Sequence, residues 1–224
     1  MFEADDLTIS DPDGNRCAEL KRRFGVSVAA DNCEAVSRSD FTFVCVQPHI
    51  VRKVIDELKD TCLRGRILIS VSAGISTGLY RSELPDAVVA RILPNPPSGI
   101  GEGAIPVTIS GNADGEQVES IMKLVGLFGK SFIVPEDKID IFTSLTSPAP
   151  VLTFFETMID ASVLCGLDRE TSSAMVFQTV MGCLKMWEKN GFNLNELIVK
   201  SCTPAGTSVE SLRVMDQMNF RAAV

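Results

Sequence analysis

The chain has 224 residues, of which 45% are hydrophobic and 6% aromatic, and its net charge at pH 7 is −8. This length can bury a core in one large domain or two smaller ones. This net negative charge argues against nucleic-acid binding as the main function. No apolar run reaches the roughly 20 residues that span a bilayer, and the acidic N-terminus lacks the apolar stretch of a signal peptide. We expect a cytoplasmic protein with no nucleic-acid partner and no membrane partner.

Metal and nucleophile motifs are scarce. The seven cysteines are spread along the chain without a Cys-x-x-Cys pair, and His49 is the only histidine. A metal site is not expected, because zinc-ligand spacings are absent. The same scarcity argues against Ser-His-Asp or Cys-His catalysis. We expect a structural or surface role for His49.

The first 135 residues alternate β-branched runs with amphipathic stretches. Strands are predicted over 7–10, 26–28, 41–46, 67–71, 88–93, 107–109 and 132–134, and helices over 13–25, 49–60 and 116–128. Asp13 is expected to cap the first helix and Gly25 to end it. This alternation predicts a mostly parallel sheet, whose ligands bind outside the carboxyl ends of the strands.

The remainder of the chain is predicted to be helical. Helices are expected over 148–164, from a cap at Asp168 through Lys189, and over 194–199. One face of the second helix carries an apolar stripe of Phe177, Val180, Met181, Leu184 and Trp187. We interpret this stripe as ordinary core, with part of the apolar area available for a subunit interface.

Two loops have unusual compositions. Residues 94–103 (Pro-Asn-Pro-Pro-Ser-Gly-Ile-Gly-Glu-Gly) follow a buried strand, and residues 203–208 (Thr-Pro-Ala-Gly-Thr-Ser) lie between helical segments. Proline fixes φ, and glycine lets other groups approach the backbone closely. Taken alone, the first loop is either a rigid turn or one wall of a small-molecule site.

Together these motifs resemble those of the pyrroline-5-carboxylate reductase family, whose members make proline from 1-pyrroline-5-carboxylate. Residues 46–49 (Val-Gln-Pro-His) resemble the family's Val-Lys-Pro turn, and residues 69–75 (Ile-Ser-Val-Ser-Ala-Gly-Ile) match the next strand end. The 94–103 loop matches the family loop near the nicotinamide, and the 203–208 loop is similar to the signature Ser-Pro-Gly-Gly-Thr-Thr. The resemblance covers nearly the whole chain.

The resemblance implies an α/β fold class, with an incomplete Rossmann-type parallel sheet followed by an all-α dimerisation domain. The implied domains are a dinucleotide-binding domain over residues 1–135 and a helical dimerisation and substrate-site domain over residues 136–224. The implied activity is reduction of 1-pyrroline-5-carboxylate, a small imino acid, to L-proline with NADPH or NADH. A homodimer or a higher homo-oligomer is expected.

Site residues follow from the same resemblance, position by position. The implied cofactor-binding residues are Ser10, Asp11, Asn32, Val46, Gln47, Ala73 and Asn95. The implied substrate-binding residues are Thr203, Gly206, Thr207, Ser208 and Glu136, and no residue is assigned to a metal. Ser208 takes the position of a family threonine thought to contact the ring nitrogen, which makes it the catalytic candidate. The alternative for each hydroxyl is N-capping of the next helix.

The chain also departs from the family. It contains no Gly-x-Gly-x-x-Gly, and its first predicted strand matches the second Rossmann strand of the family. Because the first strand is central in the order 3-2-1-4-5-6, its absence should leave two unpaired edges and remove the amides that hold the pyrophosphate. Gln47 replaces the usual lysine, and residues 144–150 replace a glycine-containing turn, so this turn must differ locally.

Three interpretations remain open. The sequence is a truncated form of a working reductase, or a catalytically impaired member that acts as a non-enzymatic dimerising module, or a related imine reductase with another substrate. The cofactor also stays open between two forms. Asp11 suits the ribose 2′-hydroxyl of NADH, whereas Ser10 and residues 15–16 (Asn-Arg) suit the 2′-phosphate of NADPH, which the family resemblance favours.

Overall fold

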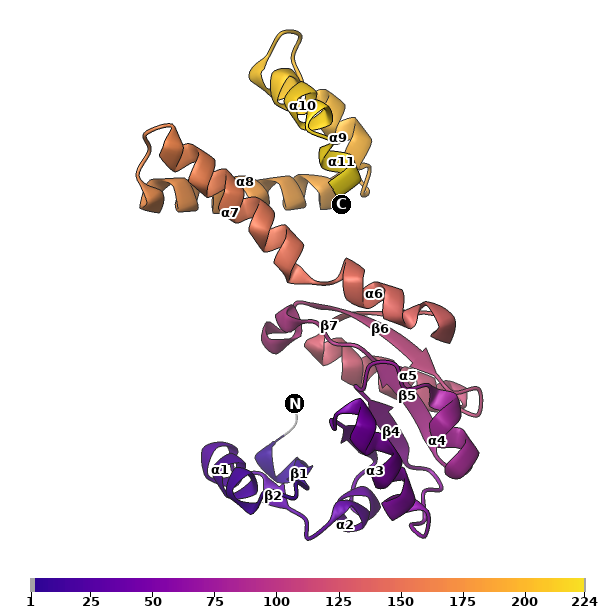
Figure 1. Ribbon diagram of the computed structural model, residues 1–224. Coiled ribbons are helices and arrows are strands. Elements are labelled where there is room, and N and C mark those ends of the chain that lie inside the picture. Colours follow the sequence, from indigo (N-terminus) through magenta and orange to yellow (C-terminus); the bar gives the residue numbers. More distant parts are fainter. Residues whose placement is uncertain (1–2, 224) are drawn as a thin grey trace. The chain divides into compact units, whose positions relative to one another are not determined.

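A computed structural model describes residues 3–223, which form two compact units, one up to Pro148 and the other from Ala149. The first unit contains all the strands and the second is helical (Figure 1). In the described part of the chain, no helix combines the length and the apolar character needed to cross a membrane.

The strands of the first unit form two sheets. Their bounds are β1 Thr8–Ile9, β2 Ser27–Val28, β3 Phe41–Val44, β4 Ile67–Ser70, β5 Val88–Ile92, β6 Gly103–Ile109 and β7 Gly129–Ile133. One sheet pairs β1 with β2, and the other has the order β3-β4-β5-β6-β7. All pairs are parallel except β5 with β6. The predicted mostly parallel sheet is therefore present.

Helices connect these strands. The α-helices are α1 Gly14–Phe24, α2 Asn32–Ser37, α3 Val51–Leu58, α4 Thr77–Glu83, α5 Gly115–Val125 and α6 Ile139–Leu145. Short 3-10 turns cover Ala4–Asp6, Pro48–Ile50, Pro96–Ile100, Gly126–Phe128 and Glu136–Lys138. The caps of α1 are those predicted. The carboxylate of Asp13 accepts the amides of Asn15 and Arg16, and Gly25 ends the helix at φ +75°.

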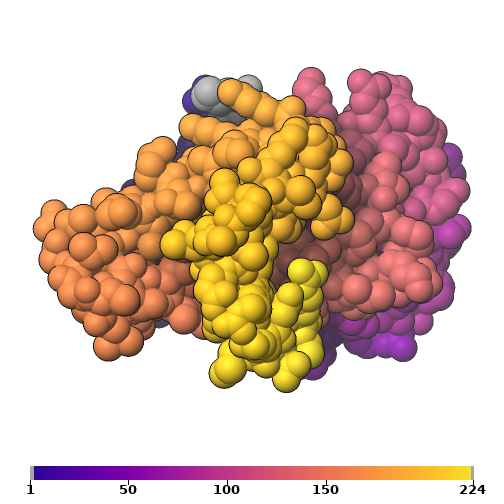
Figure 2. All heavy atoms as spheres, turned by 90° about the horizontal axis from the view of Figure 1, so that it is seen from above, coloured from indigo at the N-terminus to yellow at the C-terminus, as the bar shows by residue number. Residues whose placement is uncertain are grey.

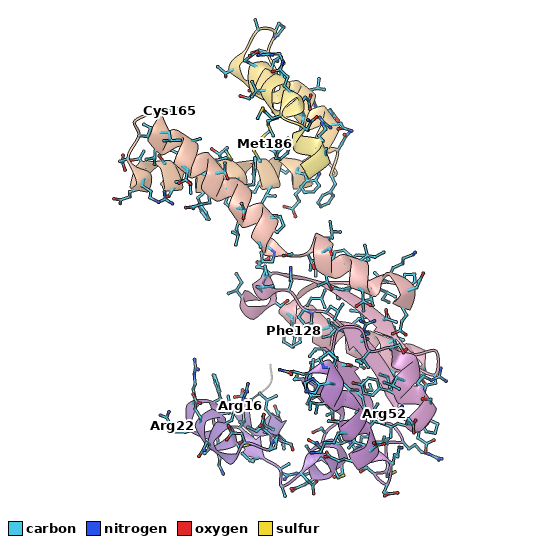
Figure 3. All side chains as sticks on the ribbon, viewed as in Figure 1. Arg16, Arg22, Arg52, Phe128, Cys165 and Met186 are labelled. Atoms are coloured by element: carbon cyan, nitrogen blue, oxygen red, sulfur yellow. The ribbon has the colours of Figure 1, made fainter. Side chains whose placement is uncertain are left out.

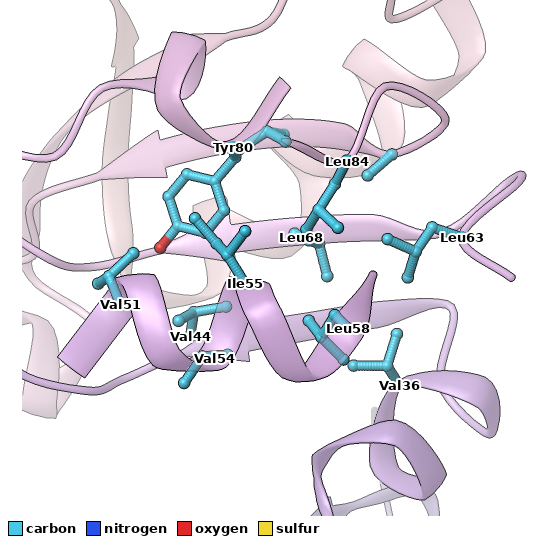
Figure 4. Packing of buried hydrophobic residues seen from close by; sticks show 12 residues of the cluster. Val36, Val44, Val51, Val54, Ile55, Leu58, Leu63, Leu68, Tyr80 and Leu84 are labelled. Atoms are coloured by element: carbon cyan, nitrogen blue, oxygen red, sulfur yellow. The ribbon is translucent and has the colours of Figure 1, made fainter. Parts of the chain in front are cut away.

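The central strands β4 and β5 of the five-stranded sheet are buried on both faces. Helices α3 and α4 cover one face, where Ile55 and Tyr80 pack against Leu68 and Val89 (Figure 4). Helix α5 covers the other face through a second cluster, which includes Ile69, Ala90, Ile92, Ile105, Val107, Ile121 and Val125. Burial on both faces explains why strands 67–70 and 88–92 read as nearly continuous apolar runs.

The two sheets are not joined to each other. Among residues 3–223, β1 pairs only with β2, and β3 pairs only with β4. Three of the four residues of β3 are only half-buried, whereas all four of β4 are buried. The hydroxyl of Thr42 on β3 is buried without a hydrogen-bond partner in the described structure. The unpaired edges expected from the sequence are therefore present.

The second unit is built from helices with little burial of their own. They are α7 Pro148–Leu164, α8 Arg169–Lys189, α9 Leu194–Lys200, α10 Thr207–Gln217 and α11 Phe220–Ala223. Among its described residues only Ser172 and Val176 are buried. The side chains of these orange and yellow helices stand at the molecular surface in the space-filling view (Figure 2).

The apolar stripe on α8 is a correction to the sequence analysis. We expected ordinary core, but Phe177 is 68% exposed and Leu184 is 49% exposed. The other three residues of the stripe are half-buried. The prediction was wrong because the helices of this unit bury too little of one another to cover the stripe. Its apolar area stays available for a subunit interface.

Candidate functional site

The carboxyl ends of three neighbouring parallel strands define one edge of the sheet. Val44 of β3, Ser70 of β4 and Arg91 of β5 lie in register, so the segments that follow them share this edge. The Ser72 hydroxyl donates to the carbonyl oxygen of Val46 over 2.7 Å, which joins the first two segments. The structure thus brings the candidates Val46, Gln47, Ala73 and Asn95 to the same edge, and leaves Gln47 and Ala73 exposed.

Asn95 holds the 94–103 loop in shape. Its side-chain amide donates to the carbonyl oxygen of Thr146 over 2.9 Å, and its Oδ1 accepts the amide of Ala104 at 3.1 Å. A Cβ added at Gly103 would lie 2.7 Å from the carbonyl oxygen of Phe128, so the chain accepts only glycine there. These contacts make the loop a rigid turn. Its contact with a cofactor stays a prediction.

The candidates for the adenosine end lie on the smaller sheet. Ser10 and Asp11 follow β1, and Asn32 begins α2 after β2. The Oδ1 of Asp11 accepts the backbone amide of Asp13 at 2.9 Å. The Oδ2 of Asp11 lies 3.9 Å from the Nε of Arg16, whose side chain extends from α1 (Figure 3). The Asn32 amide donates to the carboxylate of Glu57 on α3 over 2.6 Å. Within residues 3–223, neither a hydrogen bond nor an ion pair joins these residues to the 94–103 loop.

Glu136 lies in the first unit, where both of its carboxylate oxygens already have partners. One oxygen accepts the backbone amide of Thr77 at 2.9 Å, and the other accepts the Thr77 hydroxyl at 2.5 Å. Arg91 Nη1 lies 3.9 Å from the first oxygen. A substrate contact by Glu136 would therefore share oxygens that already accept from Thr77.

The 203–208 loop leads directly into α10. Gly206 is the N-cap, without a side-chain cap, and its amide donates to the carbonyl oxygen of Thr203 over 2.9 Å. Thr203, Thr207 and Ser208 are exposed. The capping alternative for these hydroxyls is therefore not what the structure shows. The first-turn amides of this 11-residue helix have no intrahelical partner and favour an anion.

Local backbone geometry departs from the family pattern at two turns. Ala205, where the signature has glycine, adopts φ +58°, in the left-handed region. In the turn at 144–150, by contrast, Thr146 ends α6 at φ −94° and α7 begins at Pro148, so the glycine-type angles are avoided as expected.

Sequence reasoning missed a buried polar row beside this edge. Ser70, Arg91 and Thr108 are directly in register across β4, β5 and β6, and all three are buried. Tyr80 donates its hydroxyl to Ser70 over 3.0 Å, and burial raises the pKa of Tyr80 more than this bond lowers it. The available signal was a lone charge, Arg91, within an apolar strand.

Comparisons with known proteins show what this arrangement is similar to. Residues 136–224 match the family model for pyrroline-5-carboxylate reductase dimerisation, and residues 3–74 match the model described as NADP oxidoreductase coenzyme F420-dependent. The pyrroline-5-carboxylate reductase of Escherichia coli is 31% identical over 216 residues, which cover 95% of this chain and 80% of that one. The chain belongs to the pyrroline-5-carboxylate reductase family. Pyrroline-5-carboxylate reductase 3 of Danio rerio is 33% identical over 97% of this chain and 76% of its own length.

Solved structures of the pyrroline-5-carboxylate reductase family have the same fold. The enzyme of Coxiella burnetii superposes with a TM-score of 0.85 at 25% identity, over 98% of this chain and 83% of that one. A Plasmodium falciparum pyrroline carboxylate reductase with NADP bound gives 0.84 at 24% identity, over 99% and 82% of the two chains. The expected fold class, a Rossmann-type sheet followed by a helical dimerisation region, is confirmed.

Proposed function

We propose that this protein reduces 1-pyrroline-5-carboxylate to L-proline with NADPH or NADH. The observation that carries the proposal is 31% identity to a reductase of that name over 95% of this chain. The structure adds support at the signature loop, because residues 203–208 open a helix whose first amides lack a side-chain cap.

We propose a separate role for each of the two parts of the chain that the sequence predicts. Residues 1–135 would bind the dinucleotide, and residues 136–224 would form a homodimer and carry the substrate loop. Support for the second assignment comes from the matched dimerisation model and from the exposed stripe on α8. The family match begins at residue 136, although α6 packs within the first unit through Ile139, Leu93 and Val134.

The substrate carboxylate is proposed to lie at the start of α10. The free amides of Thr207 and Ser208 would hold it without a basic residue. The hydroxyl of Thr203 would add a hydrogen bond, and the hydroxyl of Ser208 would contact the ring nitrogen. Gly206 leaves room for the Thr203 side chain, whose hydroxyl a Cβ at this position would strike. This binding orients the ring and leaves its C=N bond open to reduction.

The residues present fit the two ends of NAD(P)H but not its middle. When bound, the dihydronicotinamide supplies the hydride. The nicotinamide ring is proposed to lie at the edge that carries the exposed residues Gln47 and Ala73 and the half-buried Asn95. The start of α1, however, carries two carboxylates. Asp11 accepts the amide of the N-cap residue Asp13, and Asp13 accepts the amide of Asn15, so these negative charges disfavour a diphosphate there. The proposed adenosine contacts of Ser10, Asp11 and Asn32 are with ribose and base.

Cofactor titration tests the proposal. NADPH and NADH should quench protein fluorescence on binding, and the complex should turn over 1-pyrroline-5-carboxylate. Binding with turnover of other cyclic imines only would favour an imine reductase instead. Absence of binding at millimolar concentration would leave the non-enzymatic dimerising module.

A further inference from the structure

We propose that Arg91 is a positioning residue that fixes both loops of the carboxyl edge, 71–76 and 94–103, by acting through Glu136 and Asp140. The inference rests on the proposed function for its consequence, the geometry of the cofactor edge. Its physical basis is independent of any ligand.

The first observation is a buried and paired charge in the sheet. Arg91 lies near the carboxyl end of β5, the central strand of the five, its side chain is 3% exposed, and its register partners on β4 and β6 are Ser70 and Thr108. A buried guanidinium is costly unless carboxylates surround it. Arg91 Nη2 lies 2.6 Å from Asp140 Oδ1, and its Nε is buried without a partner in the described structure. An apolar residue would fill this place more stably if packing were the sole requirement.

The second observation is a connection to the 71–76 loop. Arg91 Nη1 faces Glu136 at 3.9 Å, and Glu136 accepts both the amide and the hydroxyl of Thr77. Thr77 is the first residue of α4 and directly follows the loop. At its other end the loop is held by the bond from Ser72 to Val46. Arg91 therefore orients the carboxylate that anchors one end of the loop.

The third observation is a connection to the 94–103 loop. Asp140 lies in the first turn of α6, and the last turn of α6 ends at Thr146, whose carbonyl oxygen accepts the side-chain amide of Asn95. Helix α6 is thus tied to β5 before the loop by Arg91 and within the loop by Asn95. Arginine suits the position because its planar fork serves two carboxylates, which the point charge of lysine does not.

Two backbone amides report on the two loops in hydrogen exchange. The Thr77 amide donates to Glu136, and the Ala104 amide donates to Asn95. In Arg91→Met both amides should exchange at least about tenfold faster than in the wild type, because their acceptors are no longer held. The matched control is Arg66→Met. Arg66 binds Asp40 and two carbonyl oxygens at the opposite, amino end of β4, so its loss should leave both amides unchanged.

Conservative variants separate positioning from simple stability. Arg91→Lys should speed exchange of both amides. The double variant Arg91→Lys with Asp140→Glu should restore slow exchange of the Ala104 amide, because the longer glutamate side chain can reach the shorter lysine, and should leave the Thr77 amide fast, because that amide is held through Glu136. These variants keep the test available if Arg91→Met does not fold. Unchanged Thr77 and Ala104 rates in Arg91→Lys, or a uniform rise across β3–β7, would overturn the proposal.

Cofactor binding gives the functional readout. In wild-type protein that binds NADPH, Arg91→Lys should raise the Kd for NADPH about tenfold or more, and Arg66→Met should not, since small misplacements of a site have effects of this size. If the wild type does not bind NADPH, the proposed function fails. The exchange rates of Thr77 and Ala104 then still decide the positioning role.

Discussion

Ser208 stands in the first turn of α10 with an exposed side chain, next to amides that lack a cap. Ser208→Ala should lower kcat/KM for 1-pyrroline-5-carboxylate about tenfold to a hundredfold, the range for a lost hydrogen bond to a charged group. The Kd for NADPH should not change. Ser211→Ala is the control, because that hydroxyl bonds the carbonyl oxygen of Thr207 within the same helix. Equal losses of turnover and cofactor affinity would contradict the assigned role.

Ala205 has a left-handed backbone, with φ +58°. Ala205→Gly should raise the free energy of unfolding by about 1 kcal/mol, because glycine adopts this angle without the steric cost that alanine has. Ala161→Gly, in the interior of α7, should lower it by about 1 kcal/mol. Urea unfolding measures both. A loss of stability in Ala205→Gly would show that the turn is not strained.

Tyr80 links stability to alkaline pH. Burial raises the pKa of its phenol above the ordinary value near 10, so the folded state holds the proton more tightly than the unfolded state. Stability should therefore fall as the pH rises through the unfolded pKa. Tyr80→Phe should remove this part of the fall, while it lowers stability at pH 7 by about 1 kcal/mol through the lost bond to Ser70. An unaltered alkaline slope would refute the assignment. Thermal melting between pH 8 and 11 provides the measurement.

At the scale of elements, the exposed edge of β3 should be visible in exchange. Its backbone faces β4 on one side, and no strand of the described chain pairs with it on the other. Amides of Phe41–Val44 should on average exchange at least about tenfold faster than those of Ile67–Ser70 in β4, which has strands on both sides. NMR-detected exchange measures this difference. Equal protection of the two strands would mean that the outer edge of β3 is covered in solution.

Local signals predicted most helices well. Asp13, Gly25 and Asp168 mark helix ends through short-range hydrogen bonds and a left-handed glycine, so the sequence alone reveals them. Strand β6 starts at Gly103, four residues before the predicted 107, because pairing with β7 extends it. Such pairing is a tertiary contact and leaves no local pattern. The short helix α4 was missed for a similar reason, since Glu136, distant in sequence, holds its first residue.

The site was predictable in part. Parallel strands share a carboxyl edge, so the grouping of Val46, Ala73 and Asn95 follows from strand order. The engagement of Glu136 by Thr77 could not be foreseen, because it joins residues 59 apart in the chain. The sequence likewise shows Arg91 only as one charged residue within an apolar strand, and it does not indicate the carboxylates with which Arg91 pairs. The hydrophobic periodicity of a sequence indicates on which face of a helix or strand a residue lies, but it does not identify the residue that it contacts.

At the scale of the whole molecule, the stripe on α8 should join two copies of the chain. Light scattering should give a mass near twice the 24.2 kDa of one chain. Phe177→Arg should shift the protein toward the monomer, because a charge would be buried at the interface. Lys189→Glu, at the end of the same helix, is the matched control and should leave the dimer intact. A wild-type monomer at micromolar concentration would contradict the proposed dimer.

The break between β1 and β3 has a thermodynamic consequence for ligand affinity. In the described range 3–30, the buried apolar residues are Cys17, Val26 and Ala29, and the sheet of this segment has two strands. We expect so small a core to melt while the five-stranded sheet stays folded. A ligand that needs both pieces must then order the smaller one as it binds. Its apparent affinity is the intrinsic affinity multiplied by the fraction of molecules in which that piece is already folded, so cofactor binding and folding become linked equilibria.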